Sequence, residues 1–224
     1  MKSILLTLTI AGAVAISCRM AQGASINVYS TGVVSPGVPN SDGSTDLHYI
    51  LTGTPPSTPV GSAFFITDQR GLPFPIWVAD DNGSKWISPQ RSYASGEADP
   101  GGTFTYHTTF SLAGLIPSTA SLGLQLAVDN AVTDVLLNGI GTGISYSSFA
   151  SLSSPFTISS GFVSGVNTLD FVVQNMSGIS GNPVGLRVLI SGNADLVPEP
   201  ASASLALLAA GFAAIWIARR QIAV

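Results

Sequence analysis

Between Ser25 and Asp195 the chain alternates apolar and polar residues with a period of two. In residues 104–112, FTYHTTFSL, the aromatic and aliphatic side chains take alternate positions, and residues 122–128, LGLQLAV, repeat the pattern with leucines. This period places the apolar residues on one face of an extended strand, whereas a helix needs them at every third or fourth position. About ten such runs, separated by clusters of Gly, Pro, Asn, Asp and Ser, predict an all-β fold, an antiparallel β-sandwich or jelly roll.

The composition fits one exported β-rich domain. The chain has 224 residues, and residues 24–196, which remain once both ends are set aside, suffice for one domain that buries about two thirds of its unfolded surface. Only 9% of the residues are charged, so hydroxyls, amides and exposed backbone must supply the polarity of the surface. The net charge of -4 and the lack of a Lys/Arg cluster exclude nucleic acid as an expected partner.

The N-terminal segment has the three parts of a secretory signal peptide. Lys2 precedes the apolar run ILLTLTIAGAVAIS, and small residues follow in AQGA. We therefore expect residues 1–23 to form a signal-peptide helix that the general secretion machinery recognises and signal peptidase cuts between Gly23 and Ala24. A lipoprotein signal at Cys18 is the alternative, but Ala15 occupies the position where Leu or Val is usual. Because Cys18 is the chain's one cysteine, cleavage leaves no disulfide.

The C-terminal segment reads as a short membrane span. Residues 201–218 are apolar or small and uncharged, and as a helix they would extend about 27 Å, enough for a thin hydrocarbon core. Arg219 and Arg220 follow directly, and positive residues favour the cytoplasmic side. We expect a transmembrane helix over 201–218, a basic cytoplasmic tail over 219–224 and the body outside the inner membrane.

The residues before the span carry a more specific signal. Val197, Pro198, Glu199 and Pro200 stand between the body and the apolar run, and the prolines, which fix φ and lack N–H donors, keep this linker extended. With the run and the arginines, residues 197–224 closely resemble the PEP-CTERM sorting signal. The resemblance implies that an exosortase, a membrane-embedded cysteine peptidase, recognises the Pro-Glu-Pro element and cuts nearby. The protein would then reach the cell surface or a biofilm matrix of exopolysaccharide.

Two stretches of the body also resemble a known fold. AVDNAVTDVLLNG at 127–139 and GVNTLDFVVQN at 165–175 are similar to a pattern of galactose-binding-like sandwich domains in secreted bacterial proteins. This resemblance implies the sandwich fold rather than sugar binding. Within the first stretch, Asn138 and Gly139 suit the positive φ angles of a two-residue hairpin turn.

Catalytic patterns are scarce in this sequence. There is no Gly-x-Ser-x-Gly elbow, and His48 and His107 are the only histidines, each in a predicted strand without a second His or Cys nearby. A carboxylate pair such as Asp80 with Asp129 is conceivable, but the sequence does not bring the two together. We therefore predict that the protein is not an enzyme, and a secreted enzyme of unknown class is the alternative.

One loop offers a candidate cation site. NSDGSTD presents oxygen side chains at every second residue, which is how a loop wraps a hard cation such as calcium. The candidate ligands are Asn40, Asp42, Ser44 and Asp46. The spacing lacks the sixth-position glycine and the distal bidentate Glu of an EF-hand, so a solvated turn is the simpler interpretation. No other metal or cofactor is expected.

Aromatic residues near a second loop, DDNGS at 80–84, suggest a sugar site. Exposed indole rings beside amides and carboxylates can stack on pyranose rings and hydrogen-bond to them. The candidates are Trp77, Trp86, Tyr93, Asp129 and Asn130, and the competing interpretation is that the tryptophans fill the core. We expect an exported, non-catalytic surface or extracellular-matrix protein, with a carbohydrate-binding module for exopolysaccharide as the alternative.

Overall fold

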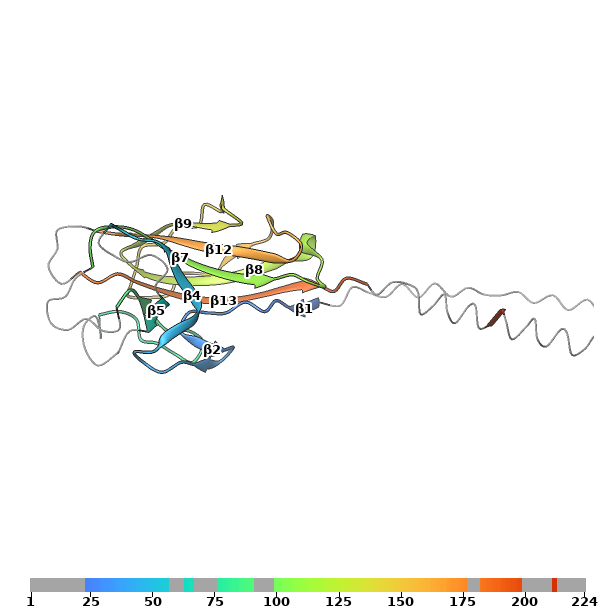
Figure 1. Cartoon of the computed structure of the whole chain (residues 1–224), viewed down its shortest axis with the longest axis horizontal. Helices are drawn as coiled ribbons and strands as arrows, with labels where there is room; N and C mark the ends of the chain where they lie inside the picture. Colours follow the sequence, from blue (N-terminus) through green and yellow to red (C-terminus); the bar gives the residue numbers. More distant parts are fainter. Residues whose placement is uncertain are drawn as a thin grey trace, which may run out of the picture. The chain divides into compact units, whose positions relative to one another are not determined.

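Most of the strands predicted by the alternation are present, and the strands pair antiparallel; residues 26–30 and 76–79, which have the same kind of extended pattern, are not in strands. The computed structural model describes residues 23–56, 63–66, 76–90, 99–176, 182–198 and 211–212, and Gly23–Val197 form one compact unit, here called the body. Hydrogen bonds join strands of the body in the order β10-β9-β12-β7-β4-β5-β6-β13-β8-β11, and β1 pairs with β13 (Figure 1).

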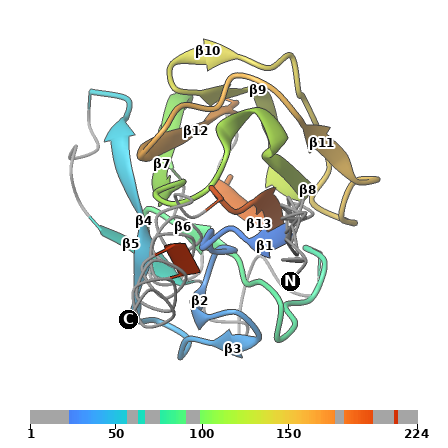
Figure 2. The same cartoon turned by 90° about the vertical axis from the view of Figure 1, so that its right-hand side faces the viewer.

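Two main sheets face each other across the body. The first contains β4 (Thr45–Gly53), β7 (Gly102–Ser111), β9 (Ala131–Leu137), β10 (Ile140–Gly141) and β12 (Val166–Asn175). The second contains β1 (Gly23–Ser25), β6 (Ile87–Ser88), β8 (Ser121–Asp129), β11 (Phe156–Ile158) and β13 (Gly185–Asp195). β5 (Ala63–Ile66) connects β4 to β6, so the sheets are joined along one side, as the view along the strands shows (Figure 2). A separate hairpin contains β2 (Val33–Ser35) and β3 (Val38–Pro39), and a 3-10 turn covers Pro117–Thr119.

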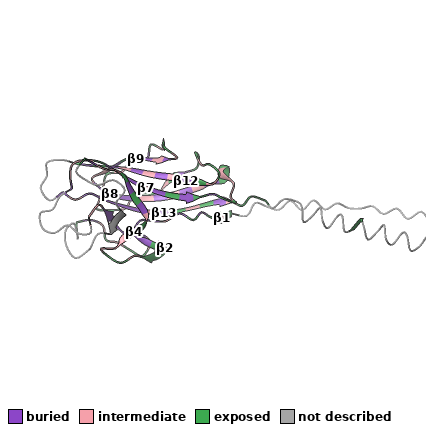
Figure 3. Cartoon of the chain, in the orientation of Figure 1, coloured by how far each residue is buried: buried purple, intermediate pink, exposed green. Residues whose placement is uncertain are grey.

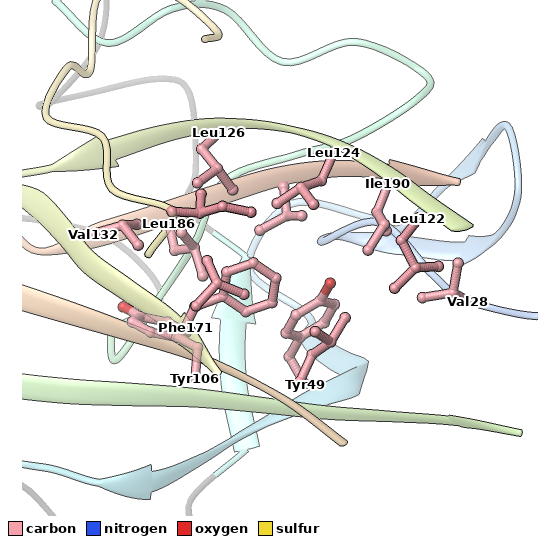
Figure 4. Close-up of a cluster of buried hydrophobic side chains, with 14 of the residues drawn as sticks. Val28, Tyr49, Tyr106, Leu122, Leu124, Leu126, Val132, Phe171, Leu186 and Ile190 are labelled. Atoms are coloured by element: carbon pink, nitrogen blue, oxygen red, sulfur yellow. The ribbon is translucent and has the colours of Figure 1, made fainter. Parts of the chain in front are cut away.

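The predicted inward faces are the buried ones. On β7, Phe104, Tyr106, Thr108 and Phe110 are buried, as is Leu112 just after it, while the residues between them are partly or fully exposed. The same alternation runs along β12, and Figure 3 shows it as changing colours along the strands. The aromatic rings of the first sheet meet the leucines of β8 and the aliphatic residues of β13 (Figure 4). The antiparallel all-β prediction is confirmed, and the likeness to galactose-binding-like domains stays a prediction.

The hairpin prediction at Asn138 and Gly139 is also confirmed. Both residues have positive φ, 52° and 78°, and the strands on either side pair Leu137 with Ile140. Such a turn matches the right-handed twist of the flanking strands.

The two predicted terminal helices fall largely outside the described residues. Only Gly211 and Phe212 of the segment 201–218 are described, and they are helical. Within the part of the chain that is described, no helix has the length and apolarity needed to cross a membrane.

Candidate functional site

Trp77 and Trp86 form a second, smaller core on the outer face of the β8–β13 pair. Their ring centroids are 4.2 Å apart, and the side chains are 2% and 0% exposed. They pack on Ala127 of β8, with Val78, Phe149 and Leu152 at the margin. Gly185 of β13 lies directly beneath, where a Cβ atom would overlap the Trp77 ring. The second sheet is therefore covered on both faces at this point.

This burial removes the basis for a sugar site at the tryptophans. A pyranose ring stacks on an exposed aromatic face, and neither indole presents one. The indole nitrogens are also engaged, because Trp77 Nε1 donates to Asp129 Oδ2 at 2.9 Å and Trp86 Nε1 donates to the Val78 carbonyl at 2.8 Å. The interpretation that these tryptophans fill a core agrees with the structure. Tyr93 lies outside the described residues.

Asp129 and Asn130 belong to a structural hydrogen-bond network. Asn130 Nδ2 donates to Asp129 Oδ1 at 2.7 Å, and Asn130 Oδ1 accepts from the Met176 N–H at 2.7 Å. Asn182 Nδ2 donates to Asn175 Oδ1 at 2.8 Å. Asp80 Oδ1 accepts from the Trp86 N–H, so both members of the carboxylate pair considered above are bonded to tryptophans. The network ties strand ends together rather than lining a cleft.

The network continues to a buried carboxylate that sequence reasoning missed. Asn175 Nδ2 donates to the Pro100 carbonyl at 3.1 Å, while Asp99 Oδ2 accepts from the Val184 N–H at 2.9 Å and Asp99 Oδ1 accepts from Gln90. Asn130 and Asn175 stand at the ends of predicted strands, where side chains often satisfy unpaired backbone groups, but Asp99 lies in a Gly-rich loop and gave no such signal.

The burial of Asp129 should make the stability of the body depend on pH. Burial raises the pKa of Asp129 from its ordinary value of 3.8, against the opposing hydrogen bond from Trp77. Because the folded state then binds the proton more tightly than the unfolded state, the contribution of Asp129 to stability is full below 3.8 and is lost as pH rises through the raised pKa. We expect the free energy of unfolding, measured in urea across this range, to fall less steeply with pH in Asp129→Asn. Equal slopes in the two proteins would contradict this assignment.

The calcium candidates are held by protein contacts. Asp46 is buried, and its carboxylate accepts the N–H groups of Gly32, His48 and Tyr49 at 2.6, 2.8 and 3.0 Å. Asp42 pairs with Lys85, while Ser44 Oγ donates to the Ser41 carbonyl. Asn40 Oδ1 accepts from the Ser41 N–H. The Asn40, Asp42 and Asp46 oxygens already accept from donors of the chain, and the Ser44 hydroxyl is directed at a carbonyl, so the four do not form a shared set of free oxygens for calcium. Asp46 is buried in β4 and is not part of a solvated turn.

A buried arginine fixes the second acidic loop. Arg187 of β13 is 1% exposed; Nε donates to Ser84 Oγ at 2.9 Å, Nη1 donates to the Ala79 carbonyl, and Nη2 pairs with Asp81 Oδ2 at 2.7 Å. Burial raises the pKa of Asp81, but the N–H groups of Ser84 and Gly83 and the Arg187 charge outweigh this effect and lower it overall. The loop 79–84 is therefore an anchored cover for β13.

The two histidines make different contacts and do not form a common site. His107 Nδ1 lies 2.7 Å from Asp170 Oδ1 on the neighbouring strand, on the face of the first sheet that points away from the core. His48 stacks on Tyr29 at 3.6 Å between ring centroids, and its Nε2 lies 3.2 Å from the Val34 carbonyl. Among the described residues, no three His, Cys, Asp or Glu side chains gather as metal ligands would.

A shallow cavity of about 290 Å³ lies between the β9–β10 hairpin and β11. Leu137, Ile144 and Ile158 line its apolar part, and hydroxyl residues including Thr142, Thr157 and Ser159 line the rest. No charged side chain lines it. Its lining therefore has neither an acid–base group nor a base beside a hydroxyl that could activate it as a nucleophile.

The first and last strands of the body lie side by side. β1 pairs with the end of β13, Gly23 opposite Asp195 and Ala24 opposite Ala194. The Val197 N–H donates to the Gly114 carbonyl at 2.9 Å, so the body stays hydrogen-bonded up to the residue before Pro198. The predicted signal-peptide cleavage site and the start of the predicted sorting element are thus neighbours. Glu199, Pro200, Arg219 and Arg220 lie outside the described residues.

Comparison with known proteins identifies this C-terminal segment. A search of curated proteins finds no match for the chain. Residues 196–221 match the family model described as the PEP-CTERM protein-sorting motif. Such a motif implies export and sorting to the cell surface through an exosortase, as the proline hinge and the following apolar run predict. The chain therefore ends in a PEP-CTERM protein-sorting motif.

Proposed function

We propose that this protein is a non-catalytic structural component of the cell surface or extracellular matrix, delivered there by exosortase processing of its C-terminal motif. The observation that carries the proposal is the match of residues 196–221 to the sorting motif, which begins at the last two hydrogen-bonded residues of the body, Leu196 and Val197. The body then serves as the delivered cargo, and residues 201–218 as its temporary membrane anchor.

The bonding of the acidic side chains supports a structural role. Acid–base or nucleophilic catalysis needs side chains aimed at a space that a substrate can enter. Asp46, Asp99 and Asp129 are buried and accept hydrogen bonds from the chain itself, and the cavity beside β11 has no titratable lining. These carboxylates hold loops and strand ends in place through their hydrogen bonds.

Replacing Pro198, Glu199 and Pro200 with alanine is expected to block processing. The exosortase would no longer recognise the linker, so the intact mass of the protein in the native cell should retain residues 198–224 and the protein should stay with the membranes. Pro36→Ala, at an exposed proline in the β2–β3 turn, is the matched control and should be processed normally. Normal C-terminal processing of the triple variant would refute the proposal.

A further inference from the structure

Exposed apolar side chains gather at the end of the body where β1 begins and β13 ends. Val163 and Val166 precede and begin β12, and Leu196 and Val197 follow β13; all four are exposed. The turn 112–115 holds the two groups together. Leu112 N–H donates to the Gly165 carbonyl at 2.8 Å, Leu115 bridges to Leu196, and Val197 N–H donates to Gly114. We call residues 111–116, 163–166 and 196–197 the terminal-end surface.

The terminal-end surface carries no charged side chain. Residues 111–121, SLAGLIPSTAS, and 159–166, SSGFVSGV, are uncharged, and Asp195 is the one charged residue in the described stretch 192–198. Asp195 is only partly exposed, and its backbone is engaged with Ile116 and Thr119. Moving this surface into a less polar environment therefore desolvates hydroxyls and backbone groups but no side-chain charge of its own. Exposed apolar residues grouped in this way mark an interaction surface.

The length of the linker limits how far this surface can lie from the bilayer. Four Cα steps separate Val197 from Ala201, where the apolar run begins, and an extended chain covers at most about 14 Å over that distance. The polar layer on each side of the hydrocarbon core is about 5–8 Å thick. Because Val197 is itself hydrogen-bonded to the body, the body cannot move away without breaking that contact. β1 and the end of β13 lie together at this end (Figure 1).

We propose that the terminal-end surface rests on the phospholipid bilayer while the tail is inserted, with Val163, Val166, Leu196 and Val197 in the headgroup layer. This inference rests on the proposed function, because it requires residues 201–218 to be anchored. The absence of basic side chains from the surface means that contact comes from apolar burial and hydrogen bonding, so it does not need anionic lipid and is insensitive to salt. The contact would hold the Pro-Glu-Pro element at the membrane face.

Two cysteine variants at opposite ends of β12 test the inference. Val166 and Met176 are 66% and 58% exposed, and the ten residues of β12 place them about 30 Å apart. Val166→Cys and Met176→Cys are each made in the full chain with Cys18→Ser and purified from membranes of a host that exports the protein but lacks exosortase. A bimane label on each cysteine is measured in phosphatidylcholine vesicles that contain a lipid with a spin label on its headgroup. We expect several-fold stronger quenching at residue 166 than at 176, unchanged by salt or by added phosphatidylglycerol.

Flotation of the labelled protein with the vesicles separates the two proposals. If the protein floats but quenching at residue 166 is as weak as at 176, the anchor holds and the bilayer contact is refuted. If the protein does not float, the anchor and the contact fail together. If the cysteine at residue 166 is shielded from a thiol reagent in native membranes but not in lipid vesicles, the surface contacts a protein partner instead of lipid, and the bilayer contact is refuted. Thermal unfolding of both variants in parallel checks that the body is intact, and Val163→Cys replaces Val166→Cys if the latter does not fold.

Discussion

Gly185→Ala is expected to destabilise the body by about 3 kcal/mol, near the upper end for overpacked sites. The new methyl group would overlap the Trp77 ring and would also press on Trp86, at 3.2 Å from its Cε3 atom. Neither indole can swing into solvent without losing a buried hydrogen bond, Trp77 to Asp129 or Trp86 to the Val78 carbonyl. The strand must therefore shift or the second core must open.

Gly123→Ala on β8 is the matched control for this experiment. Gly123 lies in the strand paired with β13, and no atom lies within 4 Å of a Cβ atom built there. The added methyl should leave stability unchanged or raise it slightly, because alanine loses less backbone entropy on folding than glycine. The measurement is the free energy of unfolding in urea, followed by tryptophan fluorescence. Similar values for the two variants would show that the tryptophans do not pack on Gly185 as described.

Arg187→Met is expected to cost about 2–3 kcal/mol, because a buried guanidinium that makes several hydrogen bonds is replaced by an apolar chain of similar length. The Ala79 carbonyl and Ser84 Oγ lose their donor, and the loop 79–84 loses its anchor on β13. Beyond the loss of stability, we expect limited proteolysis to cut within this loop in the folded variant.

Asp81→Asn separates the hydrogen bonds of Arg187 to the loop from its ion pair with the largely exposed Asp81 carboxylate. The Asp81 side chain is 57% exposed, and asparagine keeps an oxygen that can accept from the Gly83 and Ser84 N–H groups. Loss of the ion pair alone should cost about 1 kcal/mol, less than Arg187→Met, because water solvates one side of the Asp81 carboxylate and screens the pair. If Asp81→Asn destabilises the protein as much as Arg187→Met, the ion pair, and not the buried bonds, holds the loop.

The local patterns in the sequence predicted most strands and their inward faces, but not the segment that covers the outer face of the second sheet. The alternation on β7 assigns each inward residue correctly, because one face of that strand meets the core and the other faces outward. On β8 and β13 the same reasoning leaves Ala127, Gly185 and Arg187 on a solvent face, whereas all three are buried. The cover comes from residues 77–86, far away in the sequence, and a period of two carries no information about a second layer on the outer face.

The same difference explains the outcome at the candidate sites. The sorting motif is linear, so its proline hinge, apolar run and arginines can be read directly in order. The tryptophans and Asp129 depend on partners up to 52 residues away, and the sequence does not say whether an indole beside an acidic loop faces a sugar or a strand. Arg187, 103 residues from Ser84, gave no signal at all.

The position of β13 has a mechanical consequence for a protein held by its tail. β13 ends two residues before Val197, so a pull on the anchor reaches this strand once the contacts of Val197 with Gly114 and of Leu196 with Leu115 have broken. Its residues Gly185–Asn193 pair in unbroken register with Ser121–Asp129 of β8, and the ladder bonds lie across the strand axis. Tension along β13 would therefore load these bonds together in shear rather than unzip them one after another, so the strand resists extraction by a pull along its axis while the tail is anchored.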